Sequence, residues 1–399
     1  MNKGFLQRLQ EIRLKDIGHI FLFLLAVIPA FVYKKTHRPF WLICEYGEEA
    51  RDNGYYFYEY MIRNHPEQDV IYAIRTSSYD YPRVHALGKT VDYGSFMHWV
   101  TYLAAQANIS SQKGGKPNAA VCYLLEVYGH LNNNRVFLQH GIIKDDMPYI
   151  YYGNARFSLF TVSTEREYEY VAGKFGYPPG VVQKLGLCRF DDLNDESDGR
   201  RIVVMPTWRQ WLTHKSGSGA ALFRESEYYT AWNGFLRSEE LRAMLDRYDL
   251  QLCFYPHREM QRFGEEFSGI GTGRIRFATW PEADVHDLLK KGAMLVTDYS
   301  SVAMDFAYLG KPVLYYQFDV DRFRKSHLEE GYFSYTEDGF GPVLYCEEDL
   351  FRAMRDAIER NFALTDVYRR RIDSFFDLRD HGNCERTYHA VCGLVGKHK

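Results

Sequence analysis

Short apolar runs alternate with longer mixed segments along the chain from residue 39 onward. In the first half, runs of strand length occupy Trp41–Tyr46, Val70–Ile74, Ala107–Ser110, Val136–Gln139 and Leu159–Val162. In the second half they occupy Ile202–Met205, Leu250–Tyr255, Ile275–Ala278, Met294–Thr297 and Val313–Tyr316. The segments between them, such as Gly54–Arg63 and Glu239–Arg247, have the pattern of helices. Strands that alternate with helices predict βαβ units and a mostly parallel sheet in each half.

An acidic, polar stretch separates the two halves and precedes the strand near residue 202. It contains Asp191, Asp192, Asn194, Asp195, Glu196, Ser197 and Asp198. Neighbouring carboxylates in a polar run are more typical of a solvated linker than of a metal site. We therefore expect an α/β fold with two Rossmann-like domains, residues 39–192 and 193–399. Ligands would bind in a cleft at the carboxyl ends of the strands.

The first 38 residues form a third part with a different pattern. The apolar run Ile20–Tyr33 has basic residues on both sides, namely Arg8, Arg13 and Lys15 before it and Lys34, Lys35 and Arg38 after it. It is shorter than the roughly 20 residues that span a bilayer. A basic start and an apolar stretch also fit a signal peptide, but the basic residues continue after the run and no clean small-residue cleavage site is visible. We predict a monotopic or re-entrant membrane anchor with its basic flanks toward anionic lipid. The alternative is a buried first helix of the core.

Composition and charge limit the class of protein. Of 399 residues, 46% are apolar and 25% charged, which is typical of globular proteins and excludes a disordered chain or a polytopic membrane protein. The formal net charge of −3 argues against a nucleic-acid-binding protein. Residues 1–38 contain seven Lys or Arg and two Asp or Glu, a local charge of +5 that leaves −8 for the rest. The sequence thus joins a basic, apolar end to an acidic body.

Several common cofactor and metal sites have no support in the sequence. The seven cysteines include no CxxC pair, so we expect reduced, mostly buried thiols and no zinc site. No GxGxxG follows a strand and no GxxxxGK[ST] is present, so we predict neither a dinucleotide cofactor nor a P-loop. Asp319-Val320-Asp321 spells DxD in a charged stretch, and we interpret it as a surface turn. We therefore predict no metal and no cofactor.

The most informative segment runs from Ala293 to Tyr316. A buried strand leads into Asp298-Tyr299-Ser300-Ser301, after which a helix begins. A serine there is a natural N-cap, and the free N–H groups of a helix start can receive a phosphate. A serine cap without a ligand is the plain alternative.

Two histidines end predicted strands, one in each half. His140 follows Arg135–Gln139 and precedes Gly141, which allows a sharp turn; His257 follows Leu252–Pro256. In α/β domains such strand ends are where ligands bind. A histidine there can act as a general base or donate to a phosphate near neutral pH.

Three cations stand near these loops. Arg209 follows Pro206-Thr207-Trp208, where its guanidinium could clamp a diphosphate or pair with an acid. Lys144 lies downstream of His140, and Arg386 lies in a polar cluster near the carboxyl terminus.

These motifs together resemble a known family. In order, QHG with Lys144 downstream, GLCRFDD, MPTWR, YPHREM and VTDYSSVAMDFAYLGKP are similar to motifs of the CDP-glycerol glycerophosphotransferases, the teichoic acid primases and polymerases. GYFSYTEDGFGP and FFDLRDHGNCERT add to the resemblance, which covers about residues 40–390. The DYSS–DFA–KP block is the most specific. Gln139 departs from the tryptophan that family members usually have.

The resemblance implies a GT-B-like fold, an acceptor-side domain at 39–192 and a donor-binding domain at 193–399. It implies transfer of a polyol phosphate from CDP-glycerol or another CDP-polyol to a lipid-linked glycan at the cytoplasmic face of the membrane. By analogy His140 would be the general base and His257 a second catalytic residue. The residues expected to hold the donor and its phosphates are Arg209, Asp298, Ser300, Ser301, Lys144 and Arg386.

Two other functions fit the same fold. A GT-B glycosyltransferase would use a nucleotide sugar, since fold does not fix function. A catalytically silent scaffold for envelope assembly would keep the anchor and bind no donor.

Overall fold

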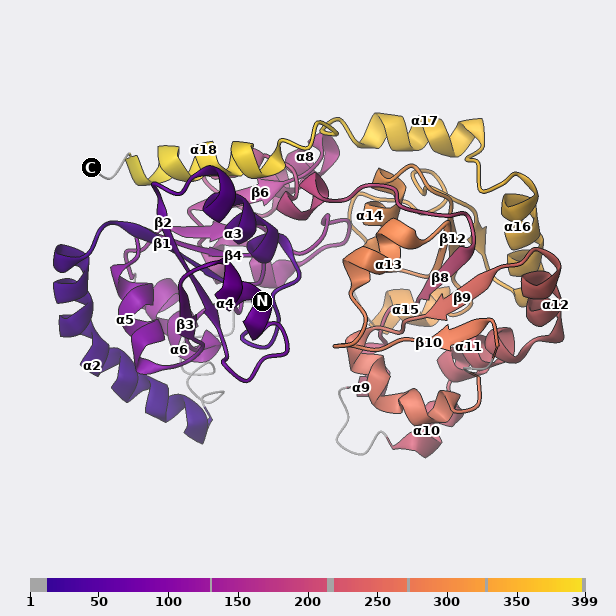
Figure 1. Ribbon diagram of the computed structural model, residues 1–399, viewed down its shortest axis with the longest axis horizontal. Helices are drawn as coiled ribbons and strands as arrows, with labels where there is room; N and C mark the ends of the chain where they lie inside the picture. The colour runs from indigo at the N-terminus through magenta and orange to yellow at the C-terminus, as the bar shows by residue number, and fades with distance from the viewer. Residues whose placement is uncertain (1–12, 130, 214–218, 271–272, 327–328, 397–399) are drawn as a thin grey trace. The chain divides into compact units, whose positions relative to one another are not determined.

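The computed structural model describes residues 13–129, 131–213, 219–270, 273–326 and 329–396 (Figure 1). Arg8, one of the predicted basic flanks, lies outside these residues. The described chain forms two compact units. The first contains residues up to Ile142, Met147–Asp192 and residues from Leu378 on; the second contains Ile143–Asp146 and Leu193–Asp377. We predicted a second domain of 193–399, whereas the final segment is grouped with the first unit.

The first unit is built on a seven-stranded parallel sheet with the order β3-β2-β1-β4-β5-β6-β7. The strands are β1 Phe40–Cys44, β2 Asp69–Ile74, β3 Thr90–Asp92, β4 Ala107–Ser110, β5 Arg135–Phe137, β6 Leu159–Val162 and β7 Val182–Lys184. The helices are α2 Leu14–Thr36, α3 Asn53–Asn64, α4 Tyr81–Leu87, α5 Phe96–Ala104, α6 Ala119–Tyr123, α7 Tyr152–Ala155, α8 Glu165–Lys174 and α18 Asn383–Gly396. A π-helix at Leu124–Tyr128 and 3₁₀ helices at Pro148–Ile150 and Cys188–Asp191 complete the unit.

Both faces of this sheet are covered, because successive side chains of a strand point to opposite faces. In β1, Trp41 and Ile43 pack with residues of α3 and α18. Phe40, Leu42 and Cys44 pack on the other face with α2, α5 and α6. A β1 strand buried on both faces explains why its sequence reads as a continuous apolar run.

The second unit has a six-stranded parallel sheet with the order β10-β9-β8-β11-β12-β13. The strands are β8 Arg201–Met205, β9 Gln251–Phe254, β10 Ile275–Phe277, β11 Met294–Thr297, β12 Val313–Tyr316 and β13 Val343–Leu344. The helices are α9 Gln210–Thr213, α10 Ala220–Arg224, α11 Glu227–Arg237, α12 Glu239–Arg247, α13 Val285–Lys291, α14 Val302–Tyr308, α15 Val320–Ser326, α16 Glu347–Glu359 and α17 Asp366–Phe375, with a 3₁₀ segment at Arg258–Phe267. Its core joins α11, α12 and α16 to one face of the sheet.

The acidic stretch between the halves is not simply a solvated linker. The Asp191 carboxylate accepts the N–H groups of Asn383 and Cys384 at 2.9 and 2.8 Å, and so caps α18. Asp195 pairs with Lys311 at 2.7 Å, and Glu196 pairs with Lys290 at 2.7 Å. These carboxylates therefore tie the ends of the two units to their own cores.

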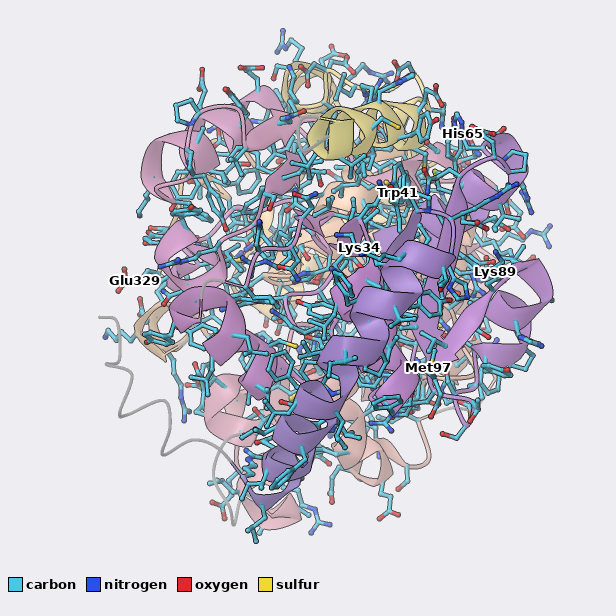
Figure 2. All side chains as sticks on the ribbon, turned by 90° about the vertical axis from the view of Figure 1, so that its left-hand side faces the viewer. Lys34, Trp41, His65, Lys89, Met97 and Glu329 are labelled. Carbon is cyan, nitrogen blue, oxygen red and sulfur yellow. The ribbon has the colours of Figure 1, made fainter. Side chains whose placement is uncertain are left out.

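Helix α2 is longer than the predicted apolar run and is apolar on all sides. One side packs against α5, with Ala26 and Ala30 buried and Trp99 Nε1 donating to His19 Nδ1 at 3.1 Å. The other side is exposed, and Figure 2 shows α2 running across that face of the first unit toward Lys34. By length and composition α2 could cross a membrane, with a mean hydropathy of 2.0. A helix that is apolar all round normally lies in a core or in lipid.

Candidate active site

The predicted strand-end residues lie at the carboxyl edges of the two sheets. In the first unit His140 follows β5; in the second unit His257 follows β9 and Asp298 follows β11. Because each sheet is parallel throughout, the loops after its strands emerge at one edge. The predicted residues are therefore distributed over two separate edges, one in each unit.

His140 is exposed at the edge of the first sheet, although protein atoms crowd around it. The resulting loss of hydration lowers the pKa of its imidazole. The nearby Asp52 carboxylate and the backbone of Ser111 oppose this shift, whereas Arg189 adds to it. Asp52 itself pairs with Arg189 Nη1 at 2.9 Å. A neutral imidazole near pH 7 can accept a proton.

Gln139 holds the backbone that presents His140. Its φ of 49° is in the left-handed region, which a non-glycine residue rarely adopts. Its buried amide donates to Thr161 O at 2.9 Å and to Glu167 Oε1 at 3.1 Å. Its carbonyl accepts from Asn53 Nδ2 at 2.8 Å. These bonds hold the turn in a conformation that the chain would otherwise leave.

His257 begins the 3₁₀ segment that follows β9. Its Nδ1 accepts the backbone N–H of Glu259 at 3.2 Å, so the neutral ring carries its proton on Nε2. Trp208 stacks beside it with a ring-centroid distance of 6.1 Å. Burial of the surroundings, followed by the charge of Arg258, lowers the pKa of His257 to about 4. The exposed imidazole thus offers a neutral N–H donor.

Arg209 lies inside the second unit with 0% of its surface exposed. Its Nη2 is 2.9 Å from Asp298 Oδ2, and its Nε donates to Asp319 Oδ2 at 2.7 Å. Its Nη1 donates to Thr207 O at 2.8 Å, and the ring of Tyr299 lies 5.1 Å from its guanidinium carbon. The expected diphosphate clamp is therefore, in this structure, a buried ion cluster.

Asp298 shares this buried position. Its Oδ1 accepts the backbone N–H groups of Thr207 at 2.8 Å and of Tyr299 at 2.6 Å. One carboxylate thereby joins the loops after β8 and β11. These bonds support a role for Asp298 in orienting the loops.

Ser300 and Ser301 are half-exposed at the start of α14. Ser300 Oγ accepts the N–H of Val302 at 3.4 Å, and Ser301 makes no side-chain cap bond within the helix. Both hydroxyls lie next to the loop that Asp298 holds. They remain accessible for a phosphate.

Lys144 is buried, and Arg386 is held by hydrogen bonds to its neighbours. Lys144 belongs to the second unit, where it is buried in an ion pair with Asp145. Arg386, in the first unit, donates to both oxygens of Asp380 at 2.9 and 2.8 Å and to Leu185 O at 3.0 Å. Both cations therefore stabilise loops in this structure.

A family model matches residues 185–393, slightly more than half of the chain. It describes the CDP-glycerol:poly(glycerophosphate) glycerophosphotransferases. The chain belongs to this family. The match covers the loops after β8, β9 and β11 described above.

Curated relatives act in teichoic acid synthesis. The chain is 28% identical over 374 residues to the minor teichoic acid biosynthesis protein GgaB of Bacillus subtilis. This match covers 90% of the chain and 40% of GgaB. It is 34% identical over 167 residues to a teichoic acid glycerol-phosphate transferase of Staphylococcus aureus. This match covers 42% of the chain and 38% of the transferase. The chain thus spans about 40% or less of the length of these relatives.

Solved structures show the same fold. The wall teichoic acid polymerase TagF matches with a TM-score of 0.67 at 16% identity, covering 99% of this chain and 100% of that one. The MnaA–UDP structure from S. aureus matches with a TM-score of 0.56 at 14% identity, covering 90% and 97%. This family member therefore has the predicted GT-B-like fold.

Glu167 is a structural residue that the sequence did not single out, and Asp319 is one whose role the sequence did not show. We interpreted Asp319 as part of a surface turn, but it is buried against Arg209. The DxD motif can be seen in the sequence, but the pairing of Asp319 with Arg209, 110 residues earlier, cannot. Among the described residues of this family member, no group of three His, Cys, Asp or Glu side chains is placed to hold a metal ion.

Proposed function

We propose that the protein transfers glycerol phosphate, or a related polyol phosphate, from a CDP-polyol to a hydroxyl of a lipid-linked glycan or growing polymer. The observation that carries the proposal is the family match across the strand-end loops of the second unit. TagF structures support it, because one is a histidine-to-asparagine variant soaked with CDPG and another is a histidine-to-alanine variant. Two exposed strand-end histidines, His140 and His257, are this chain's candidates for comparable roles.

In the proposed reaction an acceptor hydroxyl oxygen forms a bond to the β-phosphorus of the donor. The bond from that phosphorus to its bridging oxygen breaks, and the electron pair leaves with CMP. Neutral His140 takes the hydroxyl proton. His257 Nε2–H and the hydroxyls of Ser300 and Ser301 donate to phosphate oxygens. Such transfer depends on positioning and on charge stabilisation.

In this proposal Arg209 and Asp298 do not contact the substrate and act as positioning residues. They hold the loops that carry the donors, since their own polar atoms are used inside the unit. Lys144 and Arg386 likewise position their loops. This assignment places donor recognition on the half-exposed or exposed groups of the second unit.

A nucleotide-sugar glycosyltransferase is the second candidate, because the fold also matches a UDP complex. Purified protein is to be incubated with CDP-glycerol, CDP-ribitol and several nucleotide sugars, and the products of a lipid-linked acceptor analysed by mass. We expect a mass gain of one polyol phosphate and release of CMP. Turnover with a sugar donor alone would refute the proposal, and failure to bind any donor would favour the envelope scaffold.

We also propose that α2 attaches the protein peripherally to the cytoplasmic face of the membrane. Its exposed side carries Phe21, Leu24, Leu25, Ile28 and Phe31, spaced at three or four residues as one helical stripe. Ile28 is 75% exposed. Basic residues flank both ends of the helix, which favours anionic lipid.

Point variants test this attachment better than a deletion of residues 1–33. That deletion would uncover Trp99 and its neighbours, because α2 is part of the core. Leu25→Gln with Ile28→Gln changes only the exposed stripe. In a flotation assay with phosphatidylglycerol vesicles, we expect wild-type protein to rise with the vesicles and this variant to remain in the lower fractions. Equal flotation of the two proteins would refute the attachment.

A further inference from the structure

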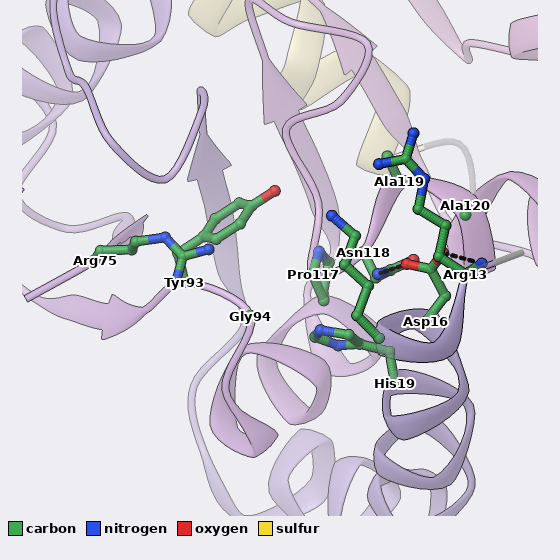
Figure 3. A pocket seen from close by; sticks show the side chains of 11 residues that line it. Arg13, Asp16, His19, Arg75, Tyr93, Gly94, Pro117, Asn118, Ala119 and Ala120 are labelled. Atoms are coloured by element: carbon green, nitrogen blue, oxygen red, sulfur yellow. Dashed lines mark hydrogen bonds between the residues drawn. The ribbon is translucent and has the colours of Figure 1, made fainter. Parts of the chain in front are cut away.

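A cavity of about 660 Å³ opens in the first unit where the start of α2 meets the loops after β2, β3 and β4 (Figure 3). Its lining combines residues of these separate segments. Arg75 follows β2, Tyr93 and Gly94 follow β3, and Pro117 and Asn118 lie in the loop after β4. The cavity therefore lies at the same carboxyl edge of the sheet as His140, which follows β5.

Cations dominate this cavity. Arg13 precedes α2 and Lys15 lies in its first turn, and Arg75 lies across from them beside Tyr93, 5.3 Å from its ring. Arg75 shares a surface ion pair with Glu48 at 2.7 Å. His19 Nδ1 accepts from Trp99 Nε1, so the neutral His19 ring carries its proton on Nε2 and can donate to a ligand.

Asp16, the one carboxylate among the described residues of the lining, is turned toward the protein. Asp16 Oδ1 accepts from Asn118 Nδ2 at 2.8 Å, and Oδ2 accepts the N–H of Arg13 at 2.9 Å (Figure 3). Asp16 is buried, so its charge is used to fix α2 to the loop after β4. The cations that remain open to the cavity favour an anionic ligand.

An exposed apolar surface begins beside this cavity. Leu14, Ile17 and Phe21 lead away from Lys15 along α2. Phe96 and Met97 are exposed just after Gly94. A ligand with a phosphate head and a hydrocarbon chain matches both surfaces, whereas a free phosphate matches only the cavity.

We propose that this cavity binds the phosphate or diphosphate that joins the acceptor glycan to its lipid, with the lipid chain lying along the exposed stripe of α2. The inference rests on the proposed function, which requires a lipid-linked acceptor. The volume is within the range of small-molecule sites and leaves room for more than a phosphate. The glycan extends along the sheet edge on which His140 lies.

The test measures binding of farnesyl diphosphate to the full chain by isothermal titration calorimetry in one fixed non-ionic detergent. Lys15→Gln with Arg75→Gln removes two cations from the cavity. Lys34→Gln with Lys35→Gln removes the same charge from the far end of α2. All four residues are exposed, so both variants are expected to fold, which thermal unfolding checks.

We expect the cavity variant to bind farnesyl diphosphate at least tenfold more weakly and the control variant to bind within twofold of wild type. Inorganic diphosphate should bind wild type at least tenfold more weakly than farnesyl diphosphate, because it lacks the chain. Equal losses in the two variants, equal affinity for inorganic diphosphate, or no binding to wild type would each overturn the proposal.

The affinity for CDP-glycerol, measured on the same proteins, separates this inference from the proposed function. Both variants should retain wild-type donor affinity. Loss of donor binding by the cavity variant alone would show that the cavity takes the donor, and would overturn the acceptor assignment. Absence of donor binding by wild type would contradict the proposed function while leaving the cavity result to stand by itself.

Discussion

The strand-end loops of the two units are held by different kinds of bond. In the first unit the loop before His140 is held largely by amide hydrogen bonds of Gln139 and Asn53. In the second unit the loops after β8 and β11 are held by the buried ions Arg209, Asp298 and Asp319. The comparison shows that the histidine is exposed in each unit, whereas the charged residues nearby in the second unit are buried and pair with one another.

The two kinds of support differ in what their loss would cost. An amide that loses its partner leaves an unsatisfied polar group, which costs about 1–3 kcal/mol. A buried ion that loses its partner leaves an uncompensated charge, which costs about 3–5 kcal/mol. Variants of the supporting residues should therefore differ in stability, whereas variants of the exposed histidines should differ in activity.

His140→Ala should give the largest effect on activity. Removing a general base lowers the transfer rate by about 10²–10⁴-fold. Because the imidazole is exposed, the thermal unfolding temperature should stay close to that of wild type. Steady-state transfer and calorimetry measure the two quantities. His85→Ala, at another exposed histidine of the same unit, is the control; retained turnover in His140→Ala would defeat the assignment.

Arg209→Met should give the largest effect on stability. It leaves Asp298 and Asp319 unpaired in the core, so the second unit should lose about 3–5 kcal/mol. Urea unfolding of the full chain, with the unfolding transitions of the two units analysed separately, measures this loss. Arg200→Gln removes an exposed arginine that is 3.5 Å from Asp249 and should change stability by less than about 1 kcal/mol. A stable Arg209→Met protein that fails to bind donor would identify Arg209 as a ligand residue instead.

His257→Ala should weaken donor binding rather than folding. Loss of a hydrogen bond to a charged phosphate costs about 1.5–3 kcal/mol, or roughly 10–100-fold in affinity. Transfer at low donor concentration should fall by the same factor while the unfolding temperature changes little. Titration with CDP-glycerol measures the affinity. Unchanged donor affinity and turnover would exclude His257 from the site.

Gln139→Leu should have a smaller, mixed effect. It removes the donor to Thr161 O and Glu167 and so should destabilise the first unit by about 1–3 kcal/mol. The misplaced turn should also lower the transfer rate without changing donor affinity. Gln139→Gly, which tolerates the positive φ, separates the loss of the amide from backbone strain. Full activity in Gln139→Leu would show that the amide does not position His140.

The pH dependence of stability should show the smallest effect. The folded pKa of His257, about 4, is below its unfolded value of about 6.5. Between these values the unfolded chain binds more protons, so His257 lowers stability as the pH falls. His257→Ala should therefore lose less stability than wild type between pH 7 and pH 5. The effect is limited by the exposure of the imidazole, and parallel slopes in thermal unfolding would contradict it.

The order of elements and the family could be read from the sequence. Each predicted strand overlaps a strand of the structure, because buried parallel strands are continuous apolar runs. The positions of His140 and His257 at strand ends followed directly from that pattern. The edge strands β3 and β7, which contain one apolar residue each, and the two-residue edge strand β13 were missed, since they carry too little apolar pattern.

Only the tertiary structure decided which polar residues are accessible. The sequence placed Arg209 and Ser301 in the same kind of strand-end loop, yet the first is buried and the second half-exposed. It showed α2 as apolar but not that one side packs on Trp99 while the other stays free. Periodicity is local, whereas burial of a charge depends on partners such as Asp319, 110 residues away from Arg209. A pattern can therefore fix strands and helices, but only packing determines which charges bind each other and which remain for a ligand.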